Sequence, residues 1–258
     1  MITLASDFGS PYPAAMKGVI LSRTDAQLVD VSHSLPRQDT RAAAFWLRET
    51  LAYFPPAVHL AVVDPGVGTD RHAIALRVGD HALVGPDNGL LRPVARRLAA
   101  QQSTPTVSAF EITIENPAST TFHGRDVFAP AAAEIHAQGV DRLADIELLS
   151  PIALDSCTDL AFPNPIVDGE TITGEVLVVD EFGNAITNIP GEQIADADRA
   201  TVNGLSTPVV ETFASVGPGE RLLTVGSHGY VECDVNQGRG DEAFGLEAGG
   251  SVRLVVED

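Results

Sequence analysis

Two aspartates in the first part of the chain stand directly after apolar runs. Asp64 follows the run VHLAVV and opens the turn DPGVGTDR, which delivers Arg71 into a glycine-containing loop, and Asp7 follows the run that begins at Ile2. In open α/β sheets, ligands bind beyond the carboxyl ends of the strands, although aspartates there also commonly cap turns. An arginine can hold a carboxylate ionised and oriented through a forked contact. Asp7 and Asp64 are therefore candidates for ligand binding or catalysis.

The signatures of several enzyme classes are absent from the sequence. There is no GKS or GKT phosphate loop, no HExxH zinc motif and no GxSxG nucleophile motif. Gly66 and Gly68 begin a dinucleotide-binding pattern, but Arg71 stands where the third glycine belongs. A second match, Gly238–Ala243, lies among expected β-strands with no βαβ unit. Phosphate transfer, zinc proteolysis, serine hydrolysis and dinucleotide binding are therefore disfavoured.

The composition is that of an acidic globular protein. The chain has 258 residues, of which 44% are hydrophobic, and a formal net charge of −19. This length suits one large domain or two modest ones, and the charge disfavours nucleic acid or an anionic membrane surface as a partner. Lys17 is the single lysine beside fifteen arginines. Acidic excess with almost no lysine favours adaptation to high salt, and an ordinary acidic protein from a GC-rich genome is the alternative.

Localisation and cysteine chemistry follow from what the chain lacks. No apolar run approaches the length of a membrane span, and the N-terminal MITLASDFG has no basic region followed by an apolar stretch. We therefore expect a cytoplasmic protein. Cys157 and Cys233 have no CxxC spacing, so packed or free cysteines are expected rather than a disulfide.

The first part of the chain alternates short apolar runs with helical periodicity. This pattern predicts an α/β domain with a largely parallel sheet over residues 1–155. Asp39 is expected to cap a helix that begins at Thr40, and Pro55 and Pro56 to end it. The expected strands are Ile2–Ala5, Leu28–Val31, Val58–Val63, Ala73–Val78 and Ala82–Val84, and the expected helices are Thr40–Phe54, Leu90–Ala100 and Asp126–Ala137.

The pattern of apolar and polar residues changes around residues 156–169. Pro163 and Pro165 stand there in a stretch of little periodicity. We interpret this stretch as a linker. Residues 170–258 show β-rich segments separated by turn signals and no helical period of useful length, which predicts a smaller all-β, barrel-like domain. The expected strands are Ile172–Val179, Ala185–Ile189, Leu222–Val225, Tyr230–Val235 and Val252–Val256.

Five motifs in order give the chain a family resemblance. They resemble those of the SAM hydroxide adenosyltransferases, relatives of the fluorinating and chlorinating enzymes that act on S-adenosylmethionine (SAM). The resemblance runs from Ile2 to about Val256. It implies SN2 attack of water or hydroxide on C5′ of SAM, giving adenosine and methionine. The motifs are SDFG at Ser6–Gly9, DPGVGTDR at 64–71, PDNGLL at Pro86–Leu91, FHGRD at Phe122–Asp126 and FGNAITNI at Phe182–Ile189.

The resemblance also implies roles for residues of the first domain. Water-using members carry an Asp–Arg–His set that corresponds to Asp64, Arg71 and His123, which would position and activate the water. A histidine can hold or deprotonate a water near neutral pH, although one beside glycine and arginine is most often only a structural hydrogen-bonder. Asp7 would accept hydrogen bonds from the two ribose hydroxyls. Asn88 is expected to form a turn at the start of a helix.

In the second domain the resemblance assigns substrate recognition. Phe182 would pack on the adenine, and Asn184 would hydrogen-bond its edge, because an amide offers a donor and an acceptor together. Asp180 would receive the methionine ammonium and Ser227 its carboxylate. Taken alone, the segment Phe182-Gly183-Asn184 would be interpreted as a plain β-turn.

The resemblance implies a homotrimer, with each site shared between the first domain of one subunit and the second domain of the next. It implies no metal and no cofactor, since SAM is the substrate. Two rival functions remain, a chloride-using halogenase and a non-catalytic sensor of SAM or adenosine. Asp64 stands where the halogenating enzymes have a tyrosine, and a carboxylate there would repel a halide. The loop Ser10–Pro13 is shorter than usual, and His228 and Gly124 replace an arginine and a serine of those enzymes.

Overall fold

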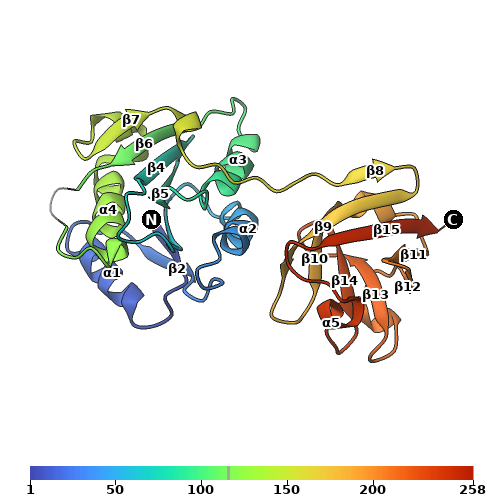
Figure 1. The fold of residues 1–258 in the computed structure, drawn as a ribbon. Helices are drawn as coiled ribbons and strands as arrows, with labels where there is room; N and C mark the ends of the chain where they lie inside the picture. Colours follow the sequence, from blue (N-terminus) through green and yellow to red (C-terminus); the bar gives the residue numbers. More distant parts are fainter. Residues whose placement is uncertain (115–116, 258) are drawn as a thin grey trace. The chain divides into compact units, whose positions relative to one another are not determined.

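The computed structural model describes residues 1–114 and 117–257. The chain forms two compact units, Met1–Ala161 and Phe162–Asp258 (Figure 1). The division falls inside the segment 156–169 that the sequence predicts as a linker. In that segment a short strand, β8 (Ile166–Asp168), pairs with the first long strand of the second unit. Among the described residues, no helix is long and apolar enough to cross a membrane.

A seven-stranded sheet, counted over the described residues, forms the centre of the first unit in the order β2-β1-β3-β5-β4-β6-β7. The β1–β2, β1–β3 and β3–β5 pairs are parallel, and the remaining pairs are antiparallel. Five of the seven strands therefore run in one direction, which confirms the predicted α/β class with a largely parallel sheet. The strands are β1 (Ile2–Ser6), β2 (Leu28–Ser32), β3 (Val58–Val62), β4 (Ala73–Val78), β5 (His81–Pro86), β6 (Ser108–Ile112) and β7 (Leu149–Ile152).

Helices cover both faces of this sheet. On one face α1 (Tyr12–Leu21) packs against α4 (Ala129–Gln138), and on the other α2 (Thr40–Leu51) packs against α3 (Arg92–Ala100) (Figure 1). Residues of α1 and α4 share one apolar core with β1 and β3. The shorter helices of this unit are the π-helix η1 (Gly124–Phe128) and the 3₁₀ helices η2 (Val140–Asp145) and η3 (Leu154–Ser156).

The helix ends show which sequence signals were informative. Asp39 caps α2 as predicted, because its Oδ1 accepts a hydrogen bond from the backbone N–H of Ala42 at 2.9 Å. Helix α1 was not predicted: Pro13 stands in its first turn, where proline is tolerated, and Gly18 in its interior has poor helix propensity. Tertiary burial of Met16, which is 0% exposed, outweighs that local preference.

The second unit is built from antiparallel strands in the order β12-β11-β15-β9-β10-β14-β13, with β8 beside β9. The end strands β12 and β13 contact each other, so the sheet is nearly closed and the predicted barrel-like domain is confirmed. Its helices are short, as expected. The elements are β9 (Thr171–Val179), β10 (Ala185–Pro190), η4 (Gly191–Ile194), β11 (Arg199–Val202), β12 (Leu205–Pro208), η5 (Phe213–Ser215), β13 (Arg221–Val225), β14 (Tyr230–Val235), α5 (Gly240–Phe244) and β15 (Ser251–Glu257).

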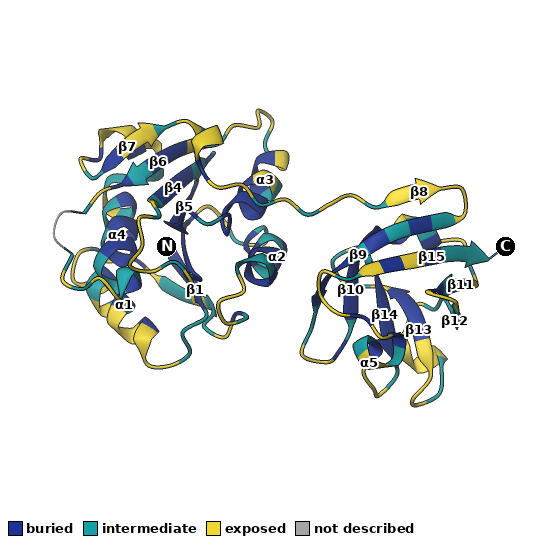
Figure 2. Ribbon diagram, in the orientation of Figure 1, coloured by how far each residue is buried: buried dark blue, intermediate teal, exposed yellow. Residues whose placement is uncertain are grey.

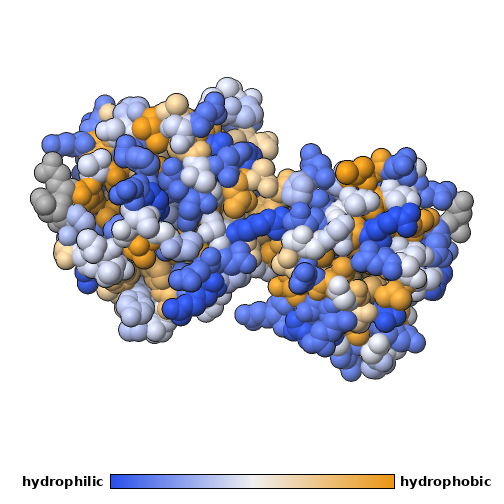
Figure 3. All heavy atoms as spheres, viewed as in Figure 1, coloured by the Kyte–Doolittle hydropathy of each residue, from blue (hydrophilic) through white to orange (hydrophobic). Residues whose placement is uncertain are grey.

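Burial follows the sheets in both units. Most strand residues are buried, and exposed residues gather in the connecting loops (Figure 2). Hydrophilic residues make up much of the face shown in Figure 3, with hydrophobic residues in smaller groups. Cys157 and Cys233 are free and buried, which confirms the prediction that they form no disulfide.

Candidate active site

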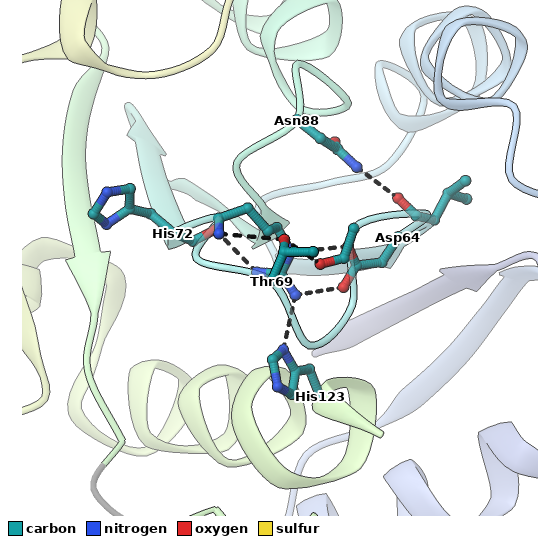
Figure 4. Close-up of polar contacts among 8 residues, drawn as sticks. Asp64, Thr69, His72, Asn88 and His123 are labelled. Atoms are coloured by element: carbon teal, nitrogen blue, oxygen red, sulfur yellow. Dashed lines mark hydrogen bonds and ion pairs between the residues drawn. The ribbon is translucent and has the colours of Figure 1, made fainter. Parts of the chain in front are cut away.

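The structure brings Asp64, Arg71 and His123 into direct contact (Figure 4). The Arg71 Nε donates to Asp64 Oδ1 at 2.8 Å, and its Nη2 donates to Asp64 Oδ2, so the contact is forked. The same Nη2 lies 3.0 Å from His123 Nδ1. The Asp64 side chain is only 4% exposed and that of Arg71 11%. Arg71 therefore links a buried carboxylate to an imidazole and fixes the orientation of both.

The Asp64 loop leaves β3 and returns to β4. Gly68 allows its tight turn, because its φ of +80° is unfavourable for other residues, and a Cβ there would lie 3.2 Å from the Thr120 carbonyl oxygen. Thr69 closes the turn by donating from its hydroxyl to the Gly66 carbonyl at 2.7 Å. Arg71 is further held by a hydrogen bond from Nη1 to the His72 carbonyl at 3.0 Å.

Asn88 supports this loop and does more than form a turn. Its side-chain Nδ2 donates to the Val63 carbonyl at 2.9 Å, immediately before Asp64, and its Oδ1 accepts from the Leu90 N–H at 3.1 Å (Figure 4). The amide thus joins the end of β3 to the segment that enters α3. The sequence indicated the turn, but it gave no sign of the contact with the end of β3.

We expect Asn88→Ala to destabilise the protein by about 1–3 kcal/mol, because the buried Val63 carbonyl and the Leu90 N–H both lose their partner. Displacement of Asp64 should lower activity as well. Chemical denaturation and steady-state kinetics check this, and Asn88→Asp, which keeps only the acceptor, should recover the Leu90 contact alone. Wild-type stability in Asn88→Ala would contradict the supporting role.

His123 stands at the start of the π-helix η1, whose residue Phe128 also carries the Arg71 guanidinium over its ring at 5.1 Å. Arginine has only donors, so His123 Nδ1 must accept, and the neutral ring carries its hydrogen on Nε2. Burial, and then the positive charge of Arg71, lower the pKa of His123 below its ordinary value, against the opposing effect of Asp64 and Asp126. The histidine is therefore held neutral near pH 7, with its hydrogen on Nε2.

A cleft of about 570 Å³ lies in the first unit, and of the trio Asp64 is among its lining residues whereas Arg71 and His123 are not. Its volume lies in the range of small-molecule sites. Both Asp7 and Asp64 line it, and the rings of Phe8, Tyr12 and Phe122 meet edge to face at its wall. Asp7 Oδ2 accepts a hydrogen bond from the Gln38 N–H at 2.7 Å. The remaining lining residues are Arg37, Gln38, Val67, Ser119, Thr121 and Arg125.

In the second unit, Asp180, Phe182 and Asn184 form one turn between β9 and β10. Asp180 Oδ1 accepts from the backbone N–H groups of Phe182 and Asn184, both at 2.9 Å, and its Oδ2 accepts from the Asn184 side chain at 3.0 Å. The segment is thus the turn that its sequence alone suggests. It presents the Phe182 ring, 79% exposed, to solvent. Ser227 lies exposed in the separate loop between β13 and β14.

Two carboxyl groups near this turn were missed by sequence reasoning. Alternation along β14 places Glu232 and Asp234 on one face of the sheet and Cys233 on the other. Burial, and then the neighbouring carboxylates including Asp180, raise the pKa of Glu232 to about 7 and that of Asp234 to about 8. Neither carboxyl oxygen of Asp234 has a hydrogen-bond partner among the described residues. The acidic residues in YVECDV were visible in the sequence, but their burial was not.

Among the described residues, no cluster of three or more His, Cys, Asp or Glu side chains could hold a metal ion.

Comparison with known proteins places both units in one family. Residues 2–146 match the SAM hydroxide adenosyltransferase N-terminal domain, and residues 174–253 match the corresponding C-terminal domain. Two relatives named (R)-S-adenosyl-L-methionine hydrolase are each 40% identical to the chain. The relative from Salinispora tropica matches 99% of this chain and 97% of its own length, and that from Thermus thermophilus matches 97% of both.

A solved structure of a conserved protein from Thermotoga maritima superposes with a TM-score of 0.83 at 32% identity, covering 99% of this chain and all of the other. A second, from Thermus thermophilus, gives a TM-score of 0.75 at 36% identity over 99% of each chain. The agreement in sequence and fold extends through both units. The chain therefore belongs to the SAM hydroxide adenosyltransferase family.

Proposed function

We propose that this protein hydrolyses SAM to adenosine and L-methionine, acting on the (R)-sulfonium epimer named for its relatives. The observation that carries the proposal is the contact of Asp64, Arg71 and His123 at a cleft of nucleoside size. Full-length similarity to proteins named (R)-SAM hydrolases supports the same reaction. Under this proposal, SAM is the substrate and no further cofactor takes part.

The reaction mainly requires a water molecule held in line with the C5′–S bond. The oxygen of water attacks C5′ as the C5′–S bond breaks, and the bonding electron pair leaves on sulfur, which becomes the neutral thioether of methionine. No general acid is needed, because the leaving group requires no proton. Holding the nucleophile in line can contribute roughly 7–11 kcal/mol at best. Placement of the water is therefore the main task of the trio.

The positions of the hydrogen atoms give His123 and Asp64 different roles toward the attacking water. The His123 Nε2–H donates to the water oxygen and leaves a lone pair for C5′, while Asp64 accepts a hydrogen bond from the water. As the O–C5′ bond forms, the proton that the oxygen sheds moves toward this carboxylate and then to solvent. Arg71 keeps the carboxylate oriented and the imidazole in the required tautomer.

This arrangement predicts a simple pH dependence. Since the pKa of His123 is lowered, the ring is neutral above its ordinary value of 6.5, and kcat should be level from there to pH 8. On acidification below that value the protonated Nδ1 can no longer accept from Arg71, so kcat should fall. A kcat profile from pH 4 to 8 checks this. A fall on the alkaline side of 6.5 with a histidine-like midpoint would contradict the assignment.

Substrate recognition is shared between the units in this proposal. Asp7 binds the ribose hydroxyls, Phe182 and Asn184 bind the adenine, and Asp180 and Ser227 bind the amino and carboxylate groups of methionine. The exposed Phe182 ring supports this role, because an aromatic side chain in solvent is available for stacking. We propose that the active protein is a homotrimer, with each site built from two subunits. Light scattering tests the trimer, and a monomer with full activity would exclude it.

From the acidic composition we also propose that the protein is cytoplasmic and that it is adapted to high salt. A net charge of −19 with a single lysine favours a cytoplasm rich in salt. Added salt screens the self-repulsion, so the melting temperature should rise as NaCl is increased from about 0.15 M to about 2 M. A melting temperature that falls steadily with NaCl would exclude salt adaptation.

Turnover in ¹⁸O-water at high chloride tests the function. Labelled adenosine, lost in Asp64→Ala and His123→Ala, establishes water as the nucleophile and the trio as its activator. Chlorinated adenosine would instead show a halogenase. Tight binding of SAM without product would show a sensor.

A further inference from the structure

A chain of four polar side chains lies behind Asp7. Ser6 Oγ is 2.8 Å from His33 Nδ1, and His33 Nε2 is 3.1 Å from Asp30 Oδ1. Lys17 Nζ donates to Asp30 Oδ2 at 2.6 Å. We call Ser6, His33, Asp30 and Lys17 the polar array. None of the four lines the cleft, and none has a role in the proposed chemistry.

The donors and acceptors of the polar array match along its length. Asp30 accepts from both neighbours, so His33 must carry its hydrogen on Nε2. In the neutral ring, Nδ1 then accepts from the Ser6 hydroxyl. Burial would raise the pKa of Asp30, but the hydrogen bonds from Lys17 and His33 outweigh it and hold that pKa below its ordinary value. The array is therefore a continuous chain of hydrogen bonds that ends in a charged pair.

The array joins three elements, one of which, β1, ends immediately before Asp7. Ser6 is the last residue of β1, Asp30 and His33 flank the end of β2, and Lys17 lies on α1. The β1–β2 register shifts beside these residues, between Leu4 and Ala5. Such irregularities re-aim side chains and are frequent next to active sites.

Backbone contacts continue the connection from the array to Asp7 itself. The Leu35 N–H donates to the Ser6 carbonyl at 3.1 Å, and the Gly9 N–H donates to the His33 carbonyl at 2.8 Å. The segment that follows His33 then supplies the Gln38 N–H that binds Asp7 Oδ2. Asp7 is thus held between two loops whose spacing the array fixes.

Lys17 adds an independent argument from composition. All fifteen other basic residues are arginines, yet a lysine occupies the end of the array. A compact ammonium can bind one carboxylate oxygen from a helix in close contact, whereas a guanidinium is larger and donates in a planar fork. The single lysine of the chain thus stands at the end of the array.

We propose that the polar array is a positioning device that fixes Asp7 to bind the ribose diol of the substrate. This inference rests on the ribose-binding part of the proposed function. Its members are positioning residues, because they act through Asp7 and not on the reacting atoms. Loss of any member should weaken recognition of the ribose hydroxyls and leave other contacts of the nucleoside intact.

The test compares binding of adenosine and 2′,3′-dideoxyadenosine to the full-length protein by calorimetry. Ser6→Ala, His33→Ala and Lys17→Met should each weaken adenosine binding by between about 10- and 100-fold, with little change for the dideoxy compound. Ser6→Thr and Lys17→Arg, which keep the hydroxyl and the charge, should recover part of the loss. Asp7→Ala gives the loss of adenosine affinity expected when the diol contact is removed entirely. Arg142→Met, which removes an exposed cation elsewhere in the first unit, should leave the affinity unchanged.

Equal losses for both nucleosides, or no loss for adenosine, would overturn the inference. Lys17 is a partly exposed side chain, so its variants keep the test decisive even if the Ser6 or His33 variants fail to fold. If the wild type binds both nucleosides equally, Asp7 does not bind the diol and the inference also fails. If the wild type discriminates but does not hydrolyse SAM, the proposed reaction fails and the inference stands.

Discussion

Replacing Arg71 by lysine is expected to lower kcat for SAM hydrolysis by about 100- to 1,000-fold while the Kd for SAM changes little. Lysine keeps the positive charge but cannot bind both oxygens of Asp64 and Nδ1 of His123 at once. The imidazole would then lose the donor that fixes its tautomer, and the carboxylate would lose its orientation. Both partners of the water would be displaced together, although neither had been mutated.

Non-additivity provides the sharpest control for this result. If the three residues act as one unit, Arg71→Lys combined with His123→Ala should cost little more than the larger single effect. Arg96→Lys is a matched substitution at an exposed ion pair with Asp159 and should leave kcat unchanged. Full activity in Arg71→Lys, or multiplicative losses in the double variant, would mean that the forked contact does not organise the water.

The sequence was most informative where local and tertiary preferences agree. The Asp39 cap on α2 and the apolar run before Asp64 are strong signals, and both features are found in the structure. Helix α1 shows the opposite case, because Pro13 and Gly18 conceal a segment that tertiary packing makes helical. The strands β6 and β7 were missed as well, and each is short and partly exposed.

The candidate site was predictable only in part. The ends of parallel strands indicated where Asp7 and Asp64 would stand, but nothing in the local pattern around His123 foretold its contact with Arg71. That contact depends on the packing of the π-helix η1 over β3, and the family resemblance alone suggested it. The support from Asn88 to the Val63 carbonyl also crosses between two strands that are not adjacent in sequence.

Burial of charge is the hardest property to infer from sequence. Strand alternation places Glu232 and Asp234 on one face of β14, but alternation alone does not tell whether that face is covered or open to solvent. On one side β10 runs next to β14, pairing Ala185 with Cys233, so the turn at Asn184 lies near Asp234. Helix α5 also packs against β14. The result is a buried acidic group next to the turn proposed to bind substrate.

Asp234→Asn is expected to stabilise the protein at pH 7 and above. The native Asp234 has a pKa raised to about 8, above the ordinary value of 3.8, so the folded state binds more protons than the unfolded state between these values. The stability that this raised pKa contributes is therefore fully present below pH 3.8 and is lost as the pH rises toward about 8. At pH 7 the folded state must hold this group protonated while the unfolded state ionises it, which costs on the order of 4 kcal/mol. An amide avoids this cost and can donate toward Glu232.

The net gain should be smaller, about 1–3 kcal/mol, because the amide must itself be desolvated. Denaturant unfolding at pH 5, 7 and 9 measures it: wild-type stability should decline between pH 5 and 9, and the variant should decline less. Asp198→Asn makes the same chemical change at an exposed site of the second unit and should leave the pH dependence as it is. A variant less stable than the wild type at pH 9 would mean that the ionised Asp234 stabilises the native protein, which would contradict its raised pKa.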